Sequence, residues 1–450
     1  MSVKPKVSVI LPVYNASRFL EQCLESITSQ TLTELEIICI DDCSTDNSLQ
    51  ILQAFQAKDN RIKIIRQSTN LGAAVARNTA MEIATGEYFS VLDADDYFTP
   101  DMFKISVERA DELNLDVFVF GARAFNEATG EESDMPWTIK EHLLPDSLVF
   151  CANDVKEDFF QIFIWWAWDK LFRRSFIEKH GLKFQQIRTS NDLLFTSSAV
   201  LLAERIAYTK QPLVFQRQKL ESSLSSTRHL SYDCCLKATV ALKEFMQQQG
   251  IYERYERDFK NYVLNFLIWN INSIGQEAYR ELYDGVKQFF ATLNITREEI
   301  YYQPFYDAYL FILEHCAEEY LFYLRLKLGV DIEESHNKIA SLEERHAEAQ
   351  KEIDEFIDRV EYLTSEAHSA NLTLEEIKAA KELLIGEHES IRTNYEAELF
   401  EKDQKLSQQS ELLSSLVKEL QARDAQIECL VSSNSWKITA PLRWIINKFK

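Results

Sequence analysis

The chain has 450 residues, with 71 Asp and Glu against 49 Lys and Arg and a formal net charge of −22. Hydrophobic residues make up 46% of it, which suffices for a packed core and excludes a wholly disordered chain. The acidic balance excludes a protein that coats nucleic acid, because such proteins neutralise phosphates with Lys and Arg.

The charge is distributed unevenly along the chain. Residues 331–430 hold 25 acidic and 11 basic residues, whereas the last 15 residues hold four basic and no acidic ones. The N-terminus does not resemble a secretory signal, and the sequence has no run of 18 apolar residues, so we expect a cytoplasmic protein without a membrane span. The eight cysteines follow no disulfide-scaffold or metal-finger spacing, which fits a reducing compartment.

The first hundred residues alternate short apolar strands with amphipathic helices. Strands are expected at 7–11, 36–40, 62–65 and 88–92, with helices at 17–27, 45–55 and 73–84. This alternation predicts βαβ crossovers and an α/β fold with a mostly parallel sheet. Ligands of such sheets bind at the carboxyl ends of the strands.

Two carboxylates, Asp93 and Asp95, directly follow the fourth predicted strand. At this spacing both can direct oxygens at one hard divalent cation, Mg²⁺ or Mn²⁺. Such a cation would let an acidic protein hold an anionic diphosphate and would stabilise the charge on a departing nucleoside diphosphate. Taken alone, the pair is weak evidence for a metal site and is better interpreted as a solvated acidic loop.

Five ordered motifs place this pair in a wider context. They are V-S-V-I-L-P-V-Y-N at 7–15, D-D-C-S-T-D at 41–46, N-L-G-A-A-V-A-R-N at 70–78, T-G-E-Y at 85–88 and L-D-A-D-D at 92–96. Together they resemble the family-2 glycosyltransferases of the GT-A fold. The resemblance implies a GT-A type Rossmann-like sheet and a hexosyltransferase that moves a sugar from a nucleotide-sugar, usually a UDP-sugar, to an acceptor hydroxyl with inversion.

The resemblance implies roles for five residues of the donor site. Pro12, Tyr14 and Asp42 would contact the nucleobase, and Arg77 would face the nucleotide pocket. Further along the chain, Arg217 would bind diphosphate oxygens through its forked donors. The alternative interpretations are a half-buried core aromatic for Tyr14, a helix-surface cation for Arg77 and a solvated loop around Arg217.

The resemblance also implies a metal site and a general base. Asp93 would contact the ribose or the metal, and Asp95 would bind the metal. The general base, which removes the proton of the acceptor hydroxyl, would be Asp192 at the start of a helix. The family usually has Glu-Asp there, and Asn191 departs from that pattern. The alternative role of Asp192 is that of a helix N-cap, for which Asp is favoured.

The segment from Trp165 to Phe176 resembles the acceptor side of the family. Trp165, Trp166 and Lys170 are therefore acceptor-side candidates, because an indole face can stack on the C–H groups of a sugar. Three Trp within four residues cannot all face one ligand, so at least one is expected in the core. Lys170 would either pair with a carboxylate near the site or touch the acceptor.

The later part of the chain has a different pattern. Residues 231–330 are expected to be a helical region, and apolar residues at alternating three- and four-residue steps within 331–430 predict a coiled coil. We therefore expect a transferase domain at 1–230, a helical accessory region at 231–330, a coiled coil at 331–430 and a basic aromatic segment at 431–450. The coil predicts self-association, and the last segment predicts either peripheral membrane contact or docking on protein.

Three functional hypotheses follow. The first is a metal-dependent inverting glycosyltransferase that uses a nucleotide-sugar donor and a glycan or lipid-linked glycan acceptor of the cell surface. The second is a sugar-nucleotide pyrophosphorylase, which the absence of a Gly-rich first loop disfavours. The third is a coiled-coil scaffold with a weakly active or inactive transferase domain, which the retention of Asp42, Asp93, Asp95 and Asp192 disfavours.

Overall fold

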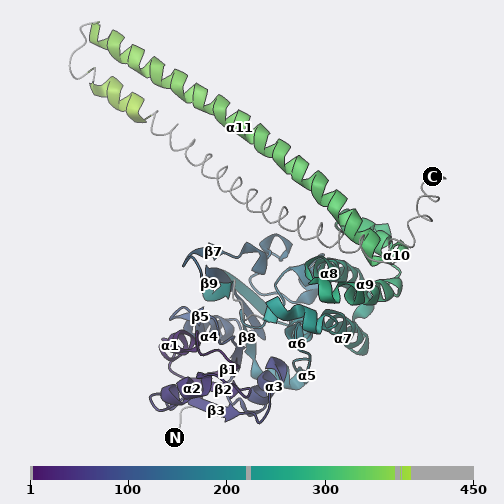
Figure 1. Ribbon diagram of the computed structural model, residues 1–450. Helices are drawn as coiled ribbons and strands as arrows, with labels where there is room; N and C mark the ends of the chain where they lie inside the picture. The colour runs from purple at the N-terminus through teal and green to yellow at the C-terminus, as the bar shows by residue number, and fades with distance from the viewer. Residues whose placement is uncertain (1–3, 219–223, 370–375, 377, 387–450) are drawn as a thin grey trace, which may run out of the picture. The chain divides into compact units, whose positions relative to one another are not determined.

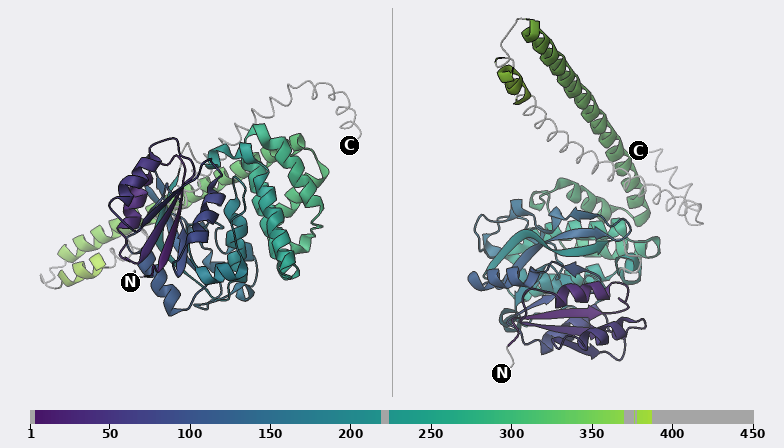
Figure 2. Two further views of the ribbon diagram at one scale, coloured as in Figure 1. Left: turned by 90° about the horizontal axis from the view of Figure 1, so that it is seen from below. Right: turned by 90° about the vertical axis from the view of Figure 1, so that its left-hand side faces the viewer.

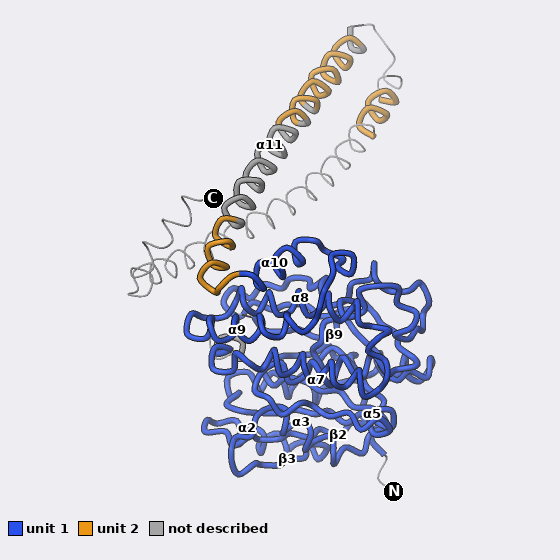
Figure 3. Tube along the Cα trace, turned by 90° about the vertical axis from the view of Figure 1, so that its right-hand side faces the viewer, with its two compact units in different colours: residues 1–314 blue, residues 315–450 orange. Residues whose placement is uncertain are grey.

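The computed structural model describes residues 4–218, 224–369, 376 and 378–386 (Figure 1). The chain divides into two compact units, residues 1–314 and 315–450 (Figure 3). The predicted boundaries at 230, 330 and 430 remain predictions. The part of the predicted coil beyond residue 386 and the segment 431–450 lie outside the described residues.

The first half of the sheet is parallel, with strand order β3-β2-β1-β4. Its strands are β1 (Val7–Val13), β2 (Leu35–Asp41), β3 (Ile62–Arg66) and β4 (Tyr88–Val91). The helices between them are α1 (Leu20–Thr28), α2 (Ser48–Gln56) and α3 (Ala73–Ile83). These four strands and three helices confirm the predicted α/β fold, with ends that differ by a few residues.

Burial explains why these segments form this half of the sheet. All seven residues of β2 are buried, as expected for a parallel strand covered on both faces. In α1, Leu20, Cys23, Leu24 and Ile27 are buried at helical spacing. The apolar strands therefore become the central layer, and each helix covers it with one face (Figure 2).

The second half of the sheet departs from the simple alternation. Its strands are β5 (Tyr97–Phe98), β6 (Val117–Asn126), β7 (Glu132–Asp134), β8 (Lys170–Arg173) and β9 (Ile206–Gln218). Strand β8 lies antiparallel between β4 and β6, whereas β6 and β9 are parallel. Gly121 lies where the β6–β9 register shifts, and a Cβ there would come within 2.3 Å of the Lys210 carbonyl oxygen. A glycine is required at this bulge.

Four of the remaining helices of the first unit lie within residues 231–330, where a helical region was predicted, and another begins beside Asp192, whereas the helices at 102–112 and 174–180 were not predicted. These remaining helices are α4 (Met102–Glu112), α5 (Arg174–His180), α6 (Asn191–Leu202), α7 (Cys234–Gln248), α8 (Tyr252–Ser273), α9 (Gln276–Ala291) and α10 (Gln303–Glu314). Short 3₁₀ turns are η1 (Pro136–Thr138), η2 (Glu141–Leu143), η3 (Ala152–Asp154), η4 (Phe159–Gln161), η5 (Leu224–Ser231) and η6 (Arg297–Glu299). Helix α6 packs on α7, and α7 packs on α8, so the helical region continues the core of the sheet domain.

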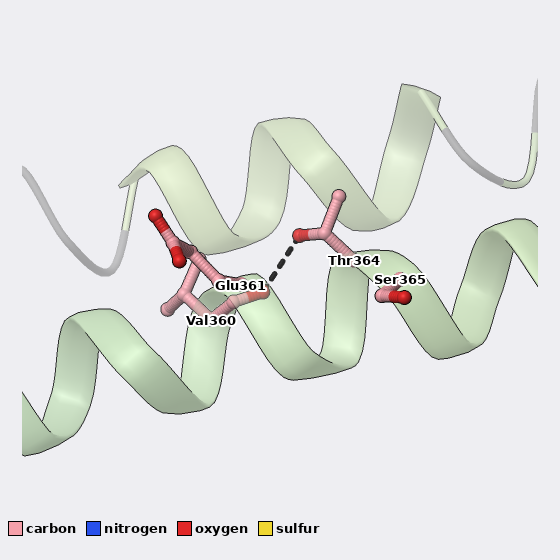
Figure 4. A pocket seen from close by; sticks show the side chains of 4 residues that line it. All are labelled: Val360, Glu361, Thr364 and Ser365. Atoms are coloured by element: carbon pink, nitrogen blue, oxygen red, sulfur yellow. Dashed lines mark hydrogen bonds between the residues drawn. The ribbon is translucent and has the colours of Figure 1, made fainter.

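The second unit contains one long helix, α11 (Ala317–Ser369), of 53 residues. It begins before the predicted coil, and its pairing with another helix stays a prediction. A shallow depression on it is lined by Val360, Glu361, Thr364 and Ser365 (Figure 4). The Thr364 hydroxyl there donates to the Val360 carbonyl at 2.7 Å, which is ordinary back-bonding within a helix. Among the described residues, no helix is long and apolar enough to cross a bilayer.

Candidate active site

The loops that follow β1 and β2 are joined at the carboxyl edge of the sheet. Asn15, directly beyond β1, has a left-handed backbone with φ of 49°. Its side-chain oxygen accepts a hydrogen bond from the Thr45 main-chain N–H at 2.8 Å, and its own N–H donates to the Ser44 hydroxyl at 3.1 Å. Hydrogen bonds therefore join the two predicted motifs that follow β1 and β2 at this edge of the sheet.

Asp42 links the loop after β2 to the start of α3. Its two carboxylate oxygens accept hydrogen bonds from the main-chain N–H groups of Leu71 and Gly72, at 2.7 and 2.8 Å. Gly72 has φ of +88°, a conformation that a side chain would strain. The buried Asp42 thus shapes the turn before α3, and its contact with a nucleobase stays a prediction.

The two other predicted base contacts lie on the same edge. Tyr14 is 48% exposed, which leaves about half of its surface accessible to a ligand, and its contact with a nucleobase stays a prediction. Pro12 is partly buried within β1, two residues before it. An exposed ring above the end of a strand can stack on a planar ligand.

A cluster of three carboxylates follows β4. Asp93, Asp95 and Asp96 each offer an oxygen, and these oxygens lie within 4.8 Å of one another. Burial and, after it, the negative charge of Asp93 together raise the pKa of Asp95 to about 6. Burial and the two neighbouring charges raise the pKa of Asp96 well above its ordinary value.

These properties fit a divalent cation. Three carboxylates at this separation repel one another, and a cation among them would relieve that repulsion. Carboxylate oxygens are the ligands that Mg²⁺ and Mn²⁺ prefer. The cluster therefore has the donor set of a metal site. The role of Asp96 was not predicted from the sequence, although it directly follows the predicted pair.

Arg77 connects this cluster to helix α6. Its guanidinium donates to Asp93 Oδ1 at 2.7 Å and to Asn191 Oδ1 at 2.6 Å, and it lies 5.2 Å from the centre of the Phe184 ring. Arg77 is 8% exposed, so the interpretation as a helix-surface cation is wrong. Its role toward a nucleotide stays a prediction.

Asp192 is the second residue of α6. The helix begins at Asn191, and the N-cap is Ser190 with φ of 55°, so the N-cap interpretation of Asp192 is wrong. Burial raises the pKa of Asp192 to about 6, and the positive charge of Arg77 opposes the rise. At neutral pH the carboxylate is mostly ionised yet more basic than an ordinary aspartate, as a general base requires.

Arg217 lies near the end of β9 and contacts Asp96 of the acidic cluster. Its main-chain N–H donates to Asp96 Oδ1 at 2.9 Å. Its guanidinium donates to Glu127 and Gln22 and lies 5.2 Å from the centre of the Tyr97 ring. With a side chain only 4% exposed, Arg217 is not in a solvated loop. Binding of a diphosphate by Arg217 stays a prediction.

The three Trp of the predicted acceptor side differ in burial. Trp165 is 7% exposed, and its indole N–H donates to the Phe160 carbonyl at 2.7 Å. Trp168 is 4% exposed and belongs to the hydrophobic core. Trp166 is half-buried, with its ring centre 5.2 Å from that of Trp168. Of the two predicted Trp, Trp166 is the one with exposed surface.

Lys170 pairs with a carboxylate, one of its two predicted alternatives. Lys170 and Asp169 are both fully buried, and the Lys170 ammonium lies 2.5 Å from Asp169 Oδ1. The partners Asp169, Asn191, Gln22 and Glu127 were not predicted. The contacts from Arg77 to Asn191 and from Arg217 to Gln22 join residues more than a hundred positions apart, which no local motif reveals.

Comparison with known proteins places a family domain in the first part of the chain. The family model "Glycosyl transferase family 2" matches residues 8–181. These residues are thus similar to glycosyltransferase family 2. The chain is 32% identical over 219 residues to the uncharacterized glycosyltransferase EpsJ of Bacillus subtilis, a match that covers 48% of this chain and 62% of EpsJ. It is 35% identical over 216 residues to the uncharacterized glycosyltransferase YibD of Escherichia coli, covering 47% and 61% of the two chains.

A further relative has a solved structure. The chain is 29% identical over 231 residues to the poly(ribitol-phosphate) beta-N-acetylglucosaminyltransferase TarS of Staphylococcus aureus, covering 50% of this chain and 38% of TarS. The crystal structure of TarS 1–349 in complex with UDP-GlcNAc aligns with a TM-score of 0.43 at 20% identity, covering 68% of this chain and 90% of that one. This chain thus spans less than two thirds of the length of EpsJ, YibD and full-length TarS.

Proposed function

We propose that the protein transfers a sugar from a UDP-sugar to an acceptor hydroxyl, with inversion at the anomeric carbon. The observation that carries this proposal is the connection made by Arg77. It joins Asp93 of the acidic cluster to Asn191, the neighbour of Asp192. One guanidinium thus links the acidic cluster, which would hold the cation, to the start of the helix that carries Asp192.

The donor would lie along the loops after β1, β2 and β4. Tyr14 offers an exposed ring for the base, and Asp42 shapes the adjoining turn. Asp93 and Asp95, with Asp96 beside them, would hold Mg²⁺ or Mn²⁺. When bound, the cation would neutralise the diphosphate and stabilise the charge on the leaving nucleoside diphosphate.

Asp192 would supply the base for the reaction. As the acceptor oxygen bonds to the anomeric carbon, its proton passes to the Asp192 carboxylate, and the bond from that carbon to the diphosphate breaks. The bond forms and breaks on opposite faces of the sugar, so the configuration inverts. Burial and Arg77 together hold the pKa of this carboxylate near 6, where it accepts a proton at neutral pH.

For the acceptor, we propose a glycan, or a lipid-linked glycan, of the cell surface. TarS is named for poly(ribitol-phosphate), a polymer whose ribitol units carry hydroxyl groups. We place the reaction in the cytoplasm or at the cytoplasmic face of the membrane, where nucleotide-sugars are used. The acidic coil at 331–430 would assemble copies of the chain, and sedimentation of a chain truncated at Gly329 tests this by loss of the oligomer.

The test of the reaction is release of UDP from a panel of UDP-hexoses and UDP-N-acetylhexosamines, with Mn²⁺, Mg²⁺ or EDTA. We expect turnover of at least one donor, loss of turnover in EDTA, and a loss of roughly a hundredfold or more for Asp95→Ala. Asp101→Ala, which removes an exposed carboxylate near the same strand, is the matched control and should keep full activity. Turnover by Asp95→Ala equal to that of the wild type would contradict the proposed metal site.

A wild-type protein that binds no donor and turns none over would instead support a scaffold with an inactive transferase domain. Binding of UDP with Mn²⁺, measured by calorimetry, separates that outcome from a donor panel that lacks the right sugar.

A further inference from the structure

A buried ion pair at the start of β8 is not used by the reaction described above. Asp169 and Lys170 both have side chains that are 0% exposed. The Lys170 ammonium donates to Asp169 Oδ1 at 2.5 Å and to the carbonyl oxygens of Ile164 and Trp166, each at 2.9 Å. An ammonium has three donors, and all three are occupied. Lys170 therefore has neither a free donor nor an exposed surface with which to touch an acceptor.

What Lys170 holds is the main chain that carries Trp166. The neighbouring Trp165 is anchored by its own indole N–H, and Trp168 is fixed in the core. Trp166 packs against the core from outside, with its ring on Trp168 and part of its surface exposed. Its main chain is held by the two carbonyl contacts of Lys170 on either side of Trp165.

The same ion pair interacts with the candidate base. The negative charge of Asp192 acts on both Asp169 and Lys170, and the positive charge of Lys170 acts on Asp192. From the helical region, Tyr262 of α8 also interacts with the Asp192 charge, and Arg77 and Asp93 do so from α3 and the loop after β4. The pair thus contacts the main chain of Trp166 and interacts electrostatically with the carboxylate that is proposed to receive the proton.

We propose that the Asp169–Lys170 pair is a positioning element for the acceptor: it holds Trp166 so that a sugar ring can lie on the exposed indole face while its hydroxyl points to Asp192. This inference rests on the proposed function. The indole face suits a sugar ring because it stacks on C–H groups, whereas water, the smallest acceptor, gains nothing from it. Transfer to a sugar and hydrolysis by water should therefore respond differently.

The test replaces both partners of the ion pair at once. Removing one partner leaves a buried charge unpaired and is strongly destabilising, so a single substitution could fail to fold. Replacing both partners with apolar residues of similar volume is often neutral for stability. The double variant Asp169→Leu/Lys170→Met therefore removes the positioning contacts and keeps the core filled.

The experiment measures three quantities for the full chain: transfer from the best UDP-sugar of the panel to p-nitrophenyl glycosides, release of UDP in their absence, and the dissociation constant of UDP with Mn²⁺. For the double variant and for Trp166→Ala, we expect transfer to fall at least tenfold. Transfer should fall at least tenfold more than hydrolysis does, UDP affinity should change less than twofold, and Trp166→Phe should recover most of the transfer. Lys183→Met, which removes an exposed ion pair with Glu82, is the control and should match the wild type.

The outcomes separate this inference from the proposed function. A folded double variant with wild-type transfer would overturn the inference, as would an equal loss of transfer and hydrolysis. If the wild type binds no UDP, the proposed function fails. Amide hydrogen exchange of residues 161–168 then still tests the positioning: faster exchange in the double variant supports it, and unchanged exchange overturns it.

Discussion

The two sides of the site are built in different ways. On the donor edge, formed by the loops after β1, β2 and β4, Asn15 and Asp42 accept hydrogen bonds from main-chain N–H groups of neighbouring loops. On the acceptor wall, formed by residues 164–170 and the start of α6, contacts join buried charged or polar side chains such as Asp169 with Lys170 and Arg77 with Asn191. The donor edge gains its shape from the backbone, whereas the acceptor wall depends on a few buried charges.

This difference implies that substitutions on the two sides affect different steps of the reaction. A change on the donor edge should weaken donor binding, and a change on the acceptor wall should reduce turnover while donor binding persists. Four predictions test that distinction.

The largest effect is expected for Asp192→Asn, which keeps the shape of the side chain and removes its basicity. Turnover should fall roughly 10²–10⁴-fold, the usual contribution of a general base. The affinity for UDP with Mn²⁺ should stay within a factor of two, because the donor edge is intact. Single-turnover kinetics and calorimetry measure the two quantities, and a parallel loss of affinity would show that the two sides are not separable.

A smaller loss is expected for Arg77→Lys, because a point charge cannot reproduce the forked contacts to Asp93 and Asn191. Hydrogen bonds to charged groups contribute about 1.5–3 kcal/mol, so turnover should fall at least tenfold. Donor affinity should also weaken, since Arg77 touches both sides. Arg109→Lys, in an exposed pair with Glu112, is the matched control. If only turnover changed, Arg77 would belong to the acceptor wall alone.

The pH dependence of turnover should reveal Asp192. Burial raises its pKa to about 6, so the active, ionised form is present above pH 6 and is lost below it. Turnover under saturating donor should therefore drop about tenfold per pH unit below that value. An acidic limb centred near pH 4, the range of an ordinary aspartate, would contradict the buried environment. Protonation of Asp95 in the acidic cluster would give a loss over the same pH range, because its pKa is also raised to about 6. Measuring the affinity for UDP and Mn²⁺ over this range distinguishes the two carboxylates.

The smallest effect on turnover is expected at the opposite end of the strands, where Glu36 is buried. Burial alone would raise its pKa, but hydrogen bonds from Lys63, Ser8 and Thr85 lower it to about 2. Glu36→Gln should therefore cost about 3 kcal/mol of unfolding free energy at pH 7. The ionised carboxylate stabilises the fold above its unfolded pKa of 4.5, and this stabilisation is lost as the pH falls toward 2.

Urea unfolding at several pH values measures this stability difference. Glu178→Gln, which alters an exposed i,i+4 pair, is the control and should change stability by less than 1 kcal/mol. Turnover of the folded Glu36→Gln protein should equal that of the wild type. A large loss of turnover would mean that a change at the opposite end of the sheet alters the site.

The same contrast explains how much could be predicted from the sequence. The four parallel strands and the residues at their ends were predictable, because apolar runs and short motifs are local signals. Asp93, Asp95 and Asp96 come together because they are neighbours in the chain. The antiparallel β8 was not predicted, since a four-residue strand between loops has no clear period.

The acceptor wall was predictable only in part. Composition suggested that one of the Trp in the W-W-A-W run would be buried, but it could not show that Trp165 and Trp168 are, while Trp166 is half-exposed. That assignment depends on Phe160 and on the Asp169–Lys170 pair, contacts that exist only in the folded chain. Asn191 departs from the family pattern. Its contact with Arg77 could not be predicted, because the two residues are 114 positions apart in the chain.

The antiparallel strand β8 has a consequence for how this kind of site can diversify. It pairs with β4 on one side and β6 on the other, so the chain beyond β7 leaves the sheet and returns to its centre at Lys170. The segment between β7 and β8 carries Trp166, and β8 is held in register by β4, which precedes a loop of the donor edge. We expect the segment 135–168 to tolerate exchange between relatives as one cassette, altering the acceptor that is recognised while the nucleotide that is bound stays the same.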